Sequence, residues 1–227
     1  MNLCVALDLP TFDENIALAK EISEYDVWLK VGFRSYIRDG KKIIDTLKAL
    51  NPNFKIFLDL KLYDIPNTMA DAAAEISLLG VDMFNVHASA GKVAMQTVME
   101  RLECTSNPPI VLAVTALTSF DEANFQAIYH DNIQTKALQF AKDAHEAGIF
   151  GVVCSAHESK MIKKHTSEKF LTLTPGIRPF GEDAGDQKRV ADIAIAKEEM
   201  VDFIVVGRPI YKAENPKEIV QRILSKI

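Results

Sequence analysis

Nearly continuous apolar runs of strand length recur along the whole chain, separated by amphipathic segments. Eight such runs can be counted, at residues 3–9, 27–31, 54–60, 83–87, 110–115, 150–155, 170–174 and 203–206. Strands that are covered on both faces of a parallel sheet are apolar along their length, whereas strands with one wet face alternate. No long linker, low-complexity tract or shift in composition separates the runs, so we expect residues 1–227 to form a single domain.

The segments between the runs carry the start signals of helices. Thr11 and Glu14 have the spacing of a capping box, and the same spacing recurs after the fifth and sixth runs, beginning at Ser119 and Ser155. Asn215 followed by a proline opens the last helix. Strands alternating with helices favour a parallel sheet, and eight units in slightly fewer than the typical ~250 residues fit a closed (β/α)8 TIM barrel. An open doubly wound sheet would want a glycine-rich turn after its first strand, which this chain lacks.

Barrels of this kind place their chemistry at the carboxyl ends of the strands, where the loops gather. The polar and special residues at these ends are Asp8, Lys30, Asp59, Lys61, Asp64, Asn85, His87, Thr115, Thr118, Arg178, Gly207 and Arg208. We therefore expect one mouth of the barrel to carry the functional site.

The third run ends in the densest group of charges. Asp59 and Lys61 are two residues apart, so a strand places both side chains on one face. Asp64 follows shortly before Pro66, which suits the first turn of a helix and keeps Asp64 near the same rim. An isolated Asp-X-Lys is most often a salt bridge that closes the end of a strand. The third charge at a fixed offset, beside the polar residues of the other strand ends, favours a catalytic group.

Two loops have the composition of a phosphate site. Residues 174–187 follow the seventh run and contain three glycines, two prolines and Arg178. The eighth run is followed by Gly207, which allows a ligand to approach the backbone, and by the forked cation Arg208. Either loop alone could be structural, for instance with Arg178 paired to a nearby aspartate. Together they indicate an anionic ligand, because barrels commonly hold phosphate after their last two strands.

Composition narrows the range of partners. The formal net charge of -5 argues against a general nucleic-acid binder, whereas a small anion needs only local positive charge. No apolar run is long enough to span a membrane. The three cysteines are far apart, and no signal-peptide pattern precedes the first run, so we expect a cytoplasmic protein.

These motifs resemble the orotidine 5'-phosphate decarboxylase family, and the resemblance covers the whole chain. The most specific match is Asp-X-Lys-X-X-Asp-Ile-Pro-Asn-Thr at residues 59–68, and further matches lie at residues 30–32, 117–119, 175–178 and 206–210. The resemblance implies a barrel that decarboxylates orotidine 5'-phosphate to UMP in pyrimidine biosynthesis. It also implies that the reaction uses no metal and no other cofactor.

The resemblance assigns roles to the charged group at the third strand. Lys61 would protonate C6 of the pyrimidine as carbon dioxide leaves, and Asp59 would lie against the leaving carboxylate between Lys30 and Lys61. Asp64 would complete this alternating array from the neighbouring subunit of a homodimer. Ile65 and Thr68 would reach the neighbouring site together with Asp64.

The remaining binding roles are implied in the same way. The residues concerned are Asp8 and Lys30 at the ribose hydroxyls, Thr118 at the pyrimidine edge, and Arg178, Gln187, Gly207 and Arg208 at the phosphate. His87 is the one histidine at the carboxyl end of a strand, and it is assigned no catalytic role.

Two other readings remain open from the sequence. A magnesium-dependent sugar-phosphate decarboxylase or aldolase of the same barrel superfamily also carries an Asp-X-Lys at the third strand. Such an enzyme needs an acidic metal ligand near the end of the second strand, where this chain has Lys30. A non-catalytic nucleotide-binding barrel would share the phosphate loops, but it would have no reason to gather alternating charges at its mouth.

Overall fold

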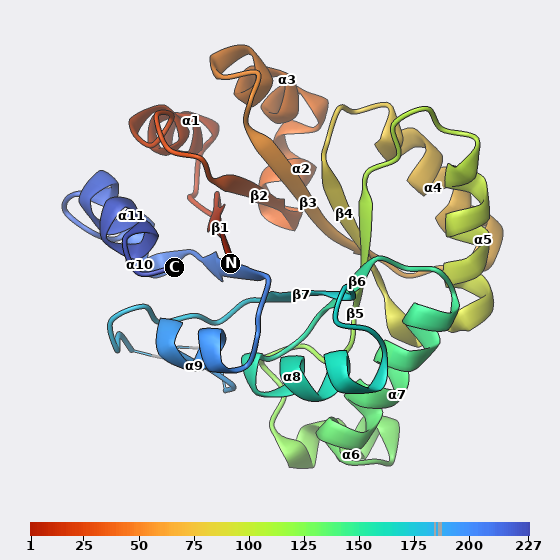
Figure 1. Cartoon of the computed structure of the whole chain (residues 1–227). Coiled ribbons are helices and arrows are strands. Elements are labelled where there is room, and N and C mark those ends of the chain that lie inside the picture. The colour runs from red at the N-terminus through yellow and green to blue at the C-terminus, as the bar shows by residue number, and fades with distance from the viewer. Residues whose placement is uncertain (184, 186–187) are drawn as a thin grey trace.

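Eight parallel strands close into a ring, and their order in the ring is their order in the chain (Figure 1). In this computed structural model, residues 1–183, 185 and 188–227 are described. The strands are β1 (Asn2–Ala6), β2 (Trp28–Gly32), β3 (Lys55–Leu62), β4 (Met83–His87), β5 (Ile110–Val114), β6 (Gly151–Val153), β7 (Leu171–Thr174) and β8 (Phe203–Val206). Because β1 pairs with both β2 and β8, no strand edge is left open. The predicted (β/α)8 barrel is confirmed.

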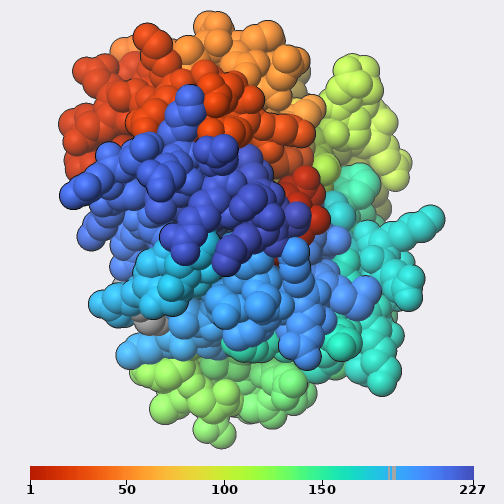
Figure 2. All heavy atoms as spheres, turned by 60° about the vertical axis from the view of Figure 1, so that its left-hand side comes forward, coloured from red at the N-terminus to blue at the C-terminus, as the bar shows by residue number. Residues whose placement is uncertain are grey.

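Helices cover the outside of the ring (Figure 1). They are α1 (Phe12–Glu21), α2 (Phe33–Asp39), α3 (Lys41–Leu50), α4 (Pro66–Ser77), α5 (Lys92–Glu103), α6 (Glu122–Tyr129), α7 (Ile133–Glu146), α8 (Ala156–His165), α9 (Ile193–Glu198), α10 (Arg208–Tyr211) and α11 (Pro216–Leu224), with the short 3-10 helix η1 (Ala88–Ala90) after β4. The connections from β2 to β3 and from β5 to β6 each hold two helices. The last helix packs beside the first, as Figure 2 shows in dark blue and red.

The predicted strands agree with the observed ones to within a few residues. β4 and β8 have the predicted bounds, whereas β1 ends at Ala6 instead of residue 9. The reason is Asn15 of α1, whose buried amide accepts from the Leu9 N–H and donates to the Leu9 carbonyl, both at 3.1 Å. These bonds pull the chain away from the barrel wall.

Helix capping follows the sequence signals with one exception. Thr11 and Glu14 form the predicted capping box, and the Asn215 side chain caps α11. The start predicted at Ser119 is wrong, because the cap of α6 is Asp121, whose carboxylate accepts from the Asn124 N–H at 2.9 Å. A tight turn between Leu117 and Phe120 occupies the segment where the helix was expected.

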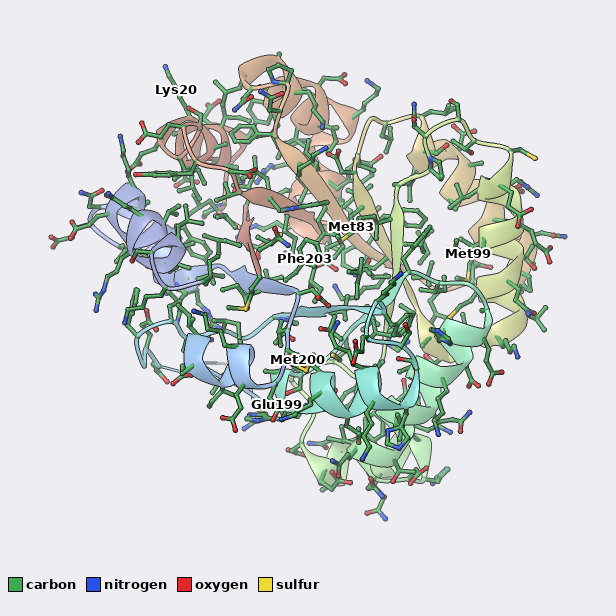
Figure 3. The ribbon with its side chains drawn as sticks, viewed as in Figure 1. Lys20, Met83, Met99, Glu199, Met200 and Phe203 are labelled. Carbon is green, nitrogen blue, oxygen red and sulfur yellow. The ribbon has the colours of Figure 1, made fainter. Side chains whose placement is uncertain are left out.

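The interior of the barrel is packed from the amino ends of the strands, which leaves space only at the carboxyl ends. Met83 and Phe203 point inward, whereas Lys20 points out to solvent (Figure 3). Trp28 meets Phe203 edge-to-face with ring centroids 5.3 Å apart. A second apolar layer lies between the strands and the helices. In the described residues the barrel is therefore filled at its amino end and open at its carboxyl end.

Two aspartates at the amino end join neighbouring strands in the same way. Asp82, just before β4, donates its N–H to the Ile56 carbonyl, and its carboxylate accepts from the Ile56 N–H, both at 2.9 Å. Lys48 of α3 donates to the same carboxylate at 2.9 Å, and the Ile110 N–H donates to the Asp82 carbonyl at 3.0 Å. This aspartate clamp holds β3, β4 and β5 together.

The second aspartate clamp holds β7, β8 and β1. Asp202 donates its N–H to the Thr172 carbonyl at 3.1 Å and accepts from the Thr172 N–H at 2.7 Å. Lys163 of α8 donates to the carboxylate at 2.7 Å, and the Asn2 N–H donates to the Asp202 carbonyl at 2.7 Å. This second clamp seals the junction between the last strand and the first.

We expect Asp82→Asn to destabilise the fold in a pH-dependent manner. Burial pushes the pKa of Asp82 upward, but hydrogen bonds from Lys48, the Ile56 N–H and Lys55 outweigh it, so the pKa lies below its usual value. A lowered carboxyl pKa stabilises the protein above about pH 4, and this contribution disappears as the pH falls through the folded-state pKa. The variant should therefore lose about 2 kcal/mol of unfolding free energy at pH 7, and the difference should shrink below about pH 4.

Urea denaturation at several pH values measures this difference. Asp45→Asn is a matched control, since Asp45 forms an exposed pair with Lys41 that should contribute less than about 1 kcal/mol. Equal losses for the two variants, or a loss at Asp82 that does not change with pH, would contradict the role of the clamp.

Candidate active site

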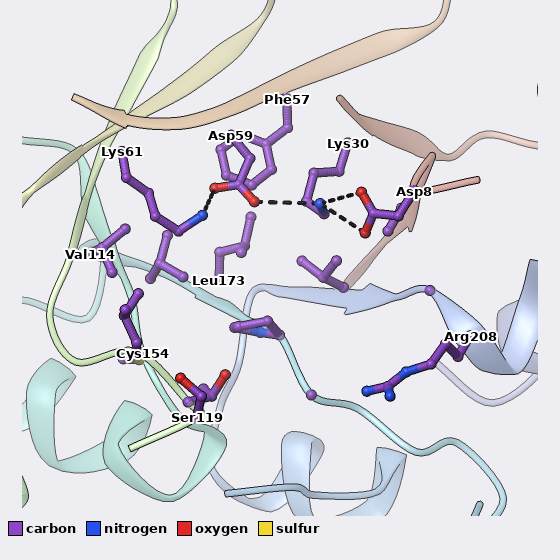
Figure 4. Close-up of a pocket in the computed structure, with 18 of the residues that line it drawn as sticks. Asp8, Lys30, Phe57, Asp59, Lys61, Val114, Ser119, Cys154, Leu173 and Arg208 are labelled. Carbon is purple, nitrogen blue, oxygen red and sulfur yellow. Dashed lines mark hydrogen bonds and ion pairs between the residues drawn. The ribbon is translucent and has the colours of Figure 1, made fainter. Parts of the chain in front are cut away.

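A cavity of about 290 Å³ lies at the carboxyl ends of the strands (Figure 4). It brings together most of the predicted site residues from six different strand ends or the loops after them. Those that line it are Asp8, Lys30, Asp59, Lys61, Thr118, Arg178, Gly207 and Arg208. The prediction that these residues meet at one mouth is confirmed, while their individual roles stay predictions.

Four charges of alternating sign form a row along one wall of the cavity (Figure 4). The Lys30 ammonium lies 3.1 Å from an Asp8 oxygen and 3.4 Å from Oδ2 of Asp59. The other oxygen of Asp59, Oδ1, accepts from Nζ of Lys61 at 2.5 Å. β2 and β3 supply three of the four members, so most of the row is built on the strands of the barrel.

The row holds its charges in place before any ligand arrives. Burial alone would raise the pKa of Asp59, but Lys30 and Lys61 outweigh burial and hold this pKa below its ordinary value. Burial alone would lower the pKa of Lys30, yet Asp59 and Asp8 raise it above its ordinary value. Both buried groups are therefore ionised at neutral pH, since each neighbour favours the charged form.

Lys61 reaches the cavity through an irregularity in β3. Leu58 pairs with Phe84 and Leu62 with Val86, so four steps along β3 match only two along β4. Within this bulge Lys61 has φ +49°, a left-handed conformation that costs an ordinary residue about 1–3 kcal/mol. Asp59 and Lys61 share a face as predicted, but a bulge and not a regular strand places them there.

The opposite side of the cavity carries the arginines of the two predicted phosphate loops. Arg208 begins α10 and lies across the cavity from Lys61 (Figure 4). Arg178 donates from Nε to the Asp183 carbonyl at 2.6 Å, which shapes the loop after β7. A side chain at Gly207 would meet no protein atom closer than 3.4 Å, so its absence leaves room on the cavity side. Gln187, also predicted at the phosphate, lies outside the described residues.

Three predicted site residues lie on the rim of the barrel and do not line the cavity of their own chain. They are Asp64, Ile65 and Thr68, and all three are exposed. The Asp64 carboxylate accepts from the N–H of Ile65 at 2.7 Å, and among the described residues no ion pair joins it to a lysine. The single chain thus leaves these residues free to face another surface.

Sequence reasoning gave no role to two polar contacts beside the cavity. Arg189, at the end of the loop after β7, pairs with the buried Glu158 of α8 and donates to the Ala116 carbonyl at 2.9 Å. The hydrogen bond to Ala116, together with one from the Lys188 N–H to the Thr118 carbonyl, ties the loop after β7 to the loop after β5. Glu158 had a visible signal as the second member of the capping box that Ser155 begins, but its partner 31 positions later did not.

The second contact is made by Asn85 of β4, which sequence reasoning placed at the correct strand end without a function. Its fully buried amide touches both Asp59 and the backbone of Lys61. His87, two residues further on, accepts from the N–H of Ser89 and packs against the ring of Tyr63. Asn85 therefore lies just behind the charged row.

The described part of the chain contains no group of three or more histidine, cysteine or acidic side chains arranged to hold a metal ion. The acidic groups of the cavity face lysines instead. No helix in that part is long and apolar enough to cross a membrane.

Comparison with known proteins agrees with the geometry. The model of the orotidine 5'-phosphate decarboxylase / HUMPS family matches residues 1–223. The orotidine 5'-phosphate decarboxylases of a Nitratiruptor species and of Sulfurimonas denitrificans are each 68% identical to this chain over 227 residues, with both chains of each pair fully covered. The crystal structure of orotidine 5'-phosphate decarboxylase from Lactobacillus acidophilus superposes with a TM-score of 0.84 at 34% identity, covering 99% of this chain and 98% of the other. The chain belongs to the orotidine 5'-phosphate decarboxylase / HUMPS family.

Proposed function

We propose that this chain decarboxylates orotidine 5'-phosphate to UMP in pyrimidine biosynthesis in the cytoplasm, with Lys61 as the proton donor and no cofactor. The observation that carries the proposal is the row of alternating charges facing a cavity whose far side holds two arginines. The identity to relatives named for this reaction supports it.

The chemistry asks for a cation beside the reacting carbon. Loss of carbon dioxide from C6 leaves a carbanion in the plane of the pyrimidine, and no carbonyl is placed to delocalise that charge. A fixed ammonium can stabilise such an anion, because a preorganised charge needs no reorganisation during the reaction. Lys61 provides this ammonium and delivers its proton to C6, while Asp59 keeps the ammonium oriented.

Asp59 has a second role in this proposal, which is to face the substrate carboxylate. Two like charges about 4 Å apart repel by roughly 4 kcal/mol at an effective dielectric constant of 20. Enzymes supply about 8–23 kcal/mol of barrier reduction, so repulsion alone does not account for the rate. Stabilisation of the carbanion by Lys61 therefore has to contribute as well.

Binding contacts far from the reacting carbon supply part of the remainder. Arg178, Gly207 and Arg208, together with Gln187, bind the phosphate in this proposal. Asp8 and Lys30 bind the ribose hydroxyls, and Thr118 contacts the pyrimidine edge. Binding energy from a distant phosphate can be used to close loops and exclude water around the reacting centre.

The magnesium-dependent alternative fits these residues less well. A metal that stabilises an enediolate needs acidic ligands at the mouth, and the end of β2 offers Lys30. The ammonium of Lys30 lies between Asp8 and Asp59, where it would compete with a cation for both carboxylates.

The first test measures turnover and its dependence on Lys61. We expect the purified protein to consume orotidine 5'-phosphate, followed by its ultraviolet absorbance, at the same rate with and without EDTA. Lys61→Ala should reduce kcat by at least about a thousandfold, because it removes the proton donor and the stabilising charge together.

Lys41→Ala serves as the matched control, since Lys41 forms an exposed pair with Asp45 and does not line the cavity. UMP should still bind to Lys61→Ala, which separates a chemical defect from a folding defect. Absence of turnover by the folded wild-type protein would refute the proposed function, and loss of turnover in EDTA would favour the magnesium-dependent reaction. A Lys61→Ala variant that keeps a tenth of the activity would remove the proton-donor role.

We also propose that the protein works as a homodimer in which Asp64, Ile65 and Thr68 reach the neighbouring site. The support is a group of large apolar side chains that a monomer leaves exposed near this rim: Phe33, Ile37, Tyr63 and Ile65. The centroid of the Phe33 ring lies 5.7 Å from Nζ of Lys61, so this apolar rim borders the charged row directly. A second copy placed there would cover the rim and bring its Asp64 toward Lys61.

Mixing two inactive variants tests this arrangement. If Asp64 acts across the interface, a heterodimer of Asp64→Asn and Lys61→Ala contains one site with both wild-type groups. Statistical mixing of equal amounts should then restore about a quarter of the wild-type activity. Verified heterodimers that stay inactive would place the whole site within one chain.

A further inference from the structure

Asn85 is fully buried behind the charged row and does not line the cavity. Its side chain makes two hydrogen bonds, each to a residue within the bulge in β3. Nδ2 donates to Oδ1 of Asp59 at 2.8 Å, and Oδ1 accepts from the backbone N–H of Lys61 at 2.7 Å. One amide thus joins the carboxylate and the lysine of the proposed reaction centre.

The orientation of this amide is fixed by its partners. A backbone N–H can only donate, so the atom facing Lys61 is the amide oxygen. An ionised carboxylate can only accept, so the atom facing Asp59 is the amide nitrogen. Among side chains of this size, a primary amide is the one that supplies a donor and an acceptor in these two directions at neutral pH.

The backbone of Lys61 needs this support. Its left-handed conformation persists only where surrounding contacts outweigh the strain, and the bulge breaks the regular pairing between β3 and β4. The bulge leaves the Lys61 N–H without a partner in the strand ladder, and Oδ1 of Asn85 accepts a hydrogen bond from it. The same side chain then sets the rotation of the Asp59 carboxylate, which receives Nζ of Lys61 on the same oxygen.

We propose that Asn85 is a positioning residue for the decarboxylation, which sets the direction of the Lys61 ammonium by holding the left-handed turn and the Asp59 carboxylate together. This inference rests on the proposed function. Asn85 acts through Asp59 and Lys61 and touches no substrate, so its loss should affect the chemical step far more than ligand binding.

Asn85→Leu removes both hydrogen bonds and keeps the branched shape of the side chain, with two methyl groups in place of the smaller amide oxygen and nitrogen. Because a displacement of about 1 Å in a reacting group can cost about a hundredfold in rate, we expect kcat to fall by about that factor. The dissociation constant of UMP should change by less than about threefold, since the phosphate and ribose contacts are untouched. A kcat near the wild-type value, or a loss of UMP affinity as large as the loss of kcat, would overturn the proposal.

Asn85→Asp gives a readout that a purely structural role would not produce. When ionised, the introduced carboxyl repels Asp59 and cannot donate to it, whereas in its protonated form it can donate to Asp59 and still accept from Lys61. Burial and the charge of Asp59 should raise the pKa of this carboxyl. The ratio of the variant kcat to the wild-type kcat should therefore rise at least about tenfold as the pH is lowered from 8 to 5. A ratio that stays constant across this range would overturn the proposal.

Thr172→Val is the matched control for losing a buried polar group. Thr172 bonds to Asp202 and Ser159 at the amino end of the barrel, away from the cavity. It should lower the melting temperature as Asn85→Leu does but leave kcat within about twofold. If Asn85→Leu does not fold, the pH-dependent recovery of Asn85→Asp carries the test by itself. Turnover by the wild-type protein is measured in the same experiment. If the wild type is inactive, the proposed function is refuted, and if it is active while the variants behave as wild type, the role of Asn85 is refuted.

Discussion

The buried carboxylate of Asp59 is the group on which the mouth of the barrel depends. An unpaired carboxylate in the wall would be prohibitively costly, so its contacts with Lys30, Lys61 and Asn85 are conditions for the fold as well as parts of the site. Because these partners come from three adjacent strands, the barrel cannot close correctly without aligning them. Folding therefore assembles the electrostatic environment in advance, and the protein does not have to reorganise it when a ligand binds.

The two sides of the mouth are built from different kinds of segment. The charged row lies on β2 and β3, whereas the arginines of the opposite side belong to the segments after β7 and β8. Arg189 connects the far end of the segment after β7 to the carbonyl of Ala116, which precedes the predicted pyrimidine contact Thr118. A ligand that contacts the arginines would therefore also act on the loop that carries Thr118.

The sequence predicted the strands well because buried parallel strands are continuous apolar runs, and it placed Asp59 and Lys61 on one face from their spacing alone. It could not predict the bulge at Lys61, since the stabilising amide comes from Asn85 on the next strand. The capping-box spacing placed the start of α6 at Ser119. The helix begins two residues later because Asp121 is an equally good cap. The pairing of Arg189 with Glu158 is also non-local. The fold pattern placed residues from several strands at one mouth, but specific side-chain contacts between distant segments could not be read from the chain.

The two aspartate clamps have a consequence for how the ring is joined. Asp82 bonds to Ile56 of β3 and to Ile110 of β5, and Asp202 bonds in the same way to Thr172 of β7 and to Asn2 of β1. The carbonyl bond of Asp202 thus joins the last strand to the first. At this aspartate the junction between β8 and β1 is therefore bonded in the same way as the junction between β4 and β5, which a connecting segment spans. Closure of the cylinder does not rely on covalent order, so the same ring would be compatible with a circularly permuted chain whose ends were relocated to another gap at the amino end.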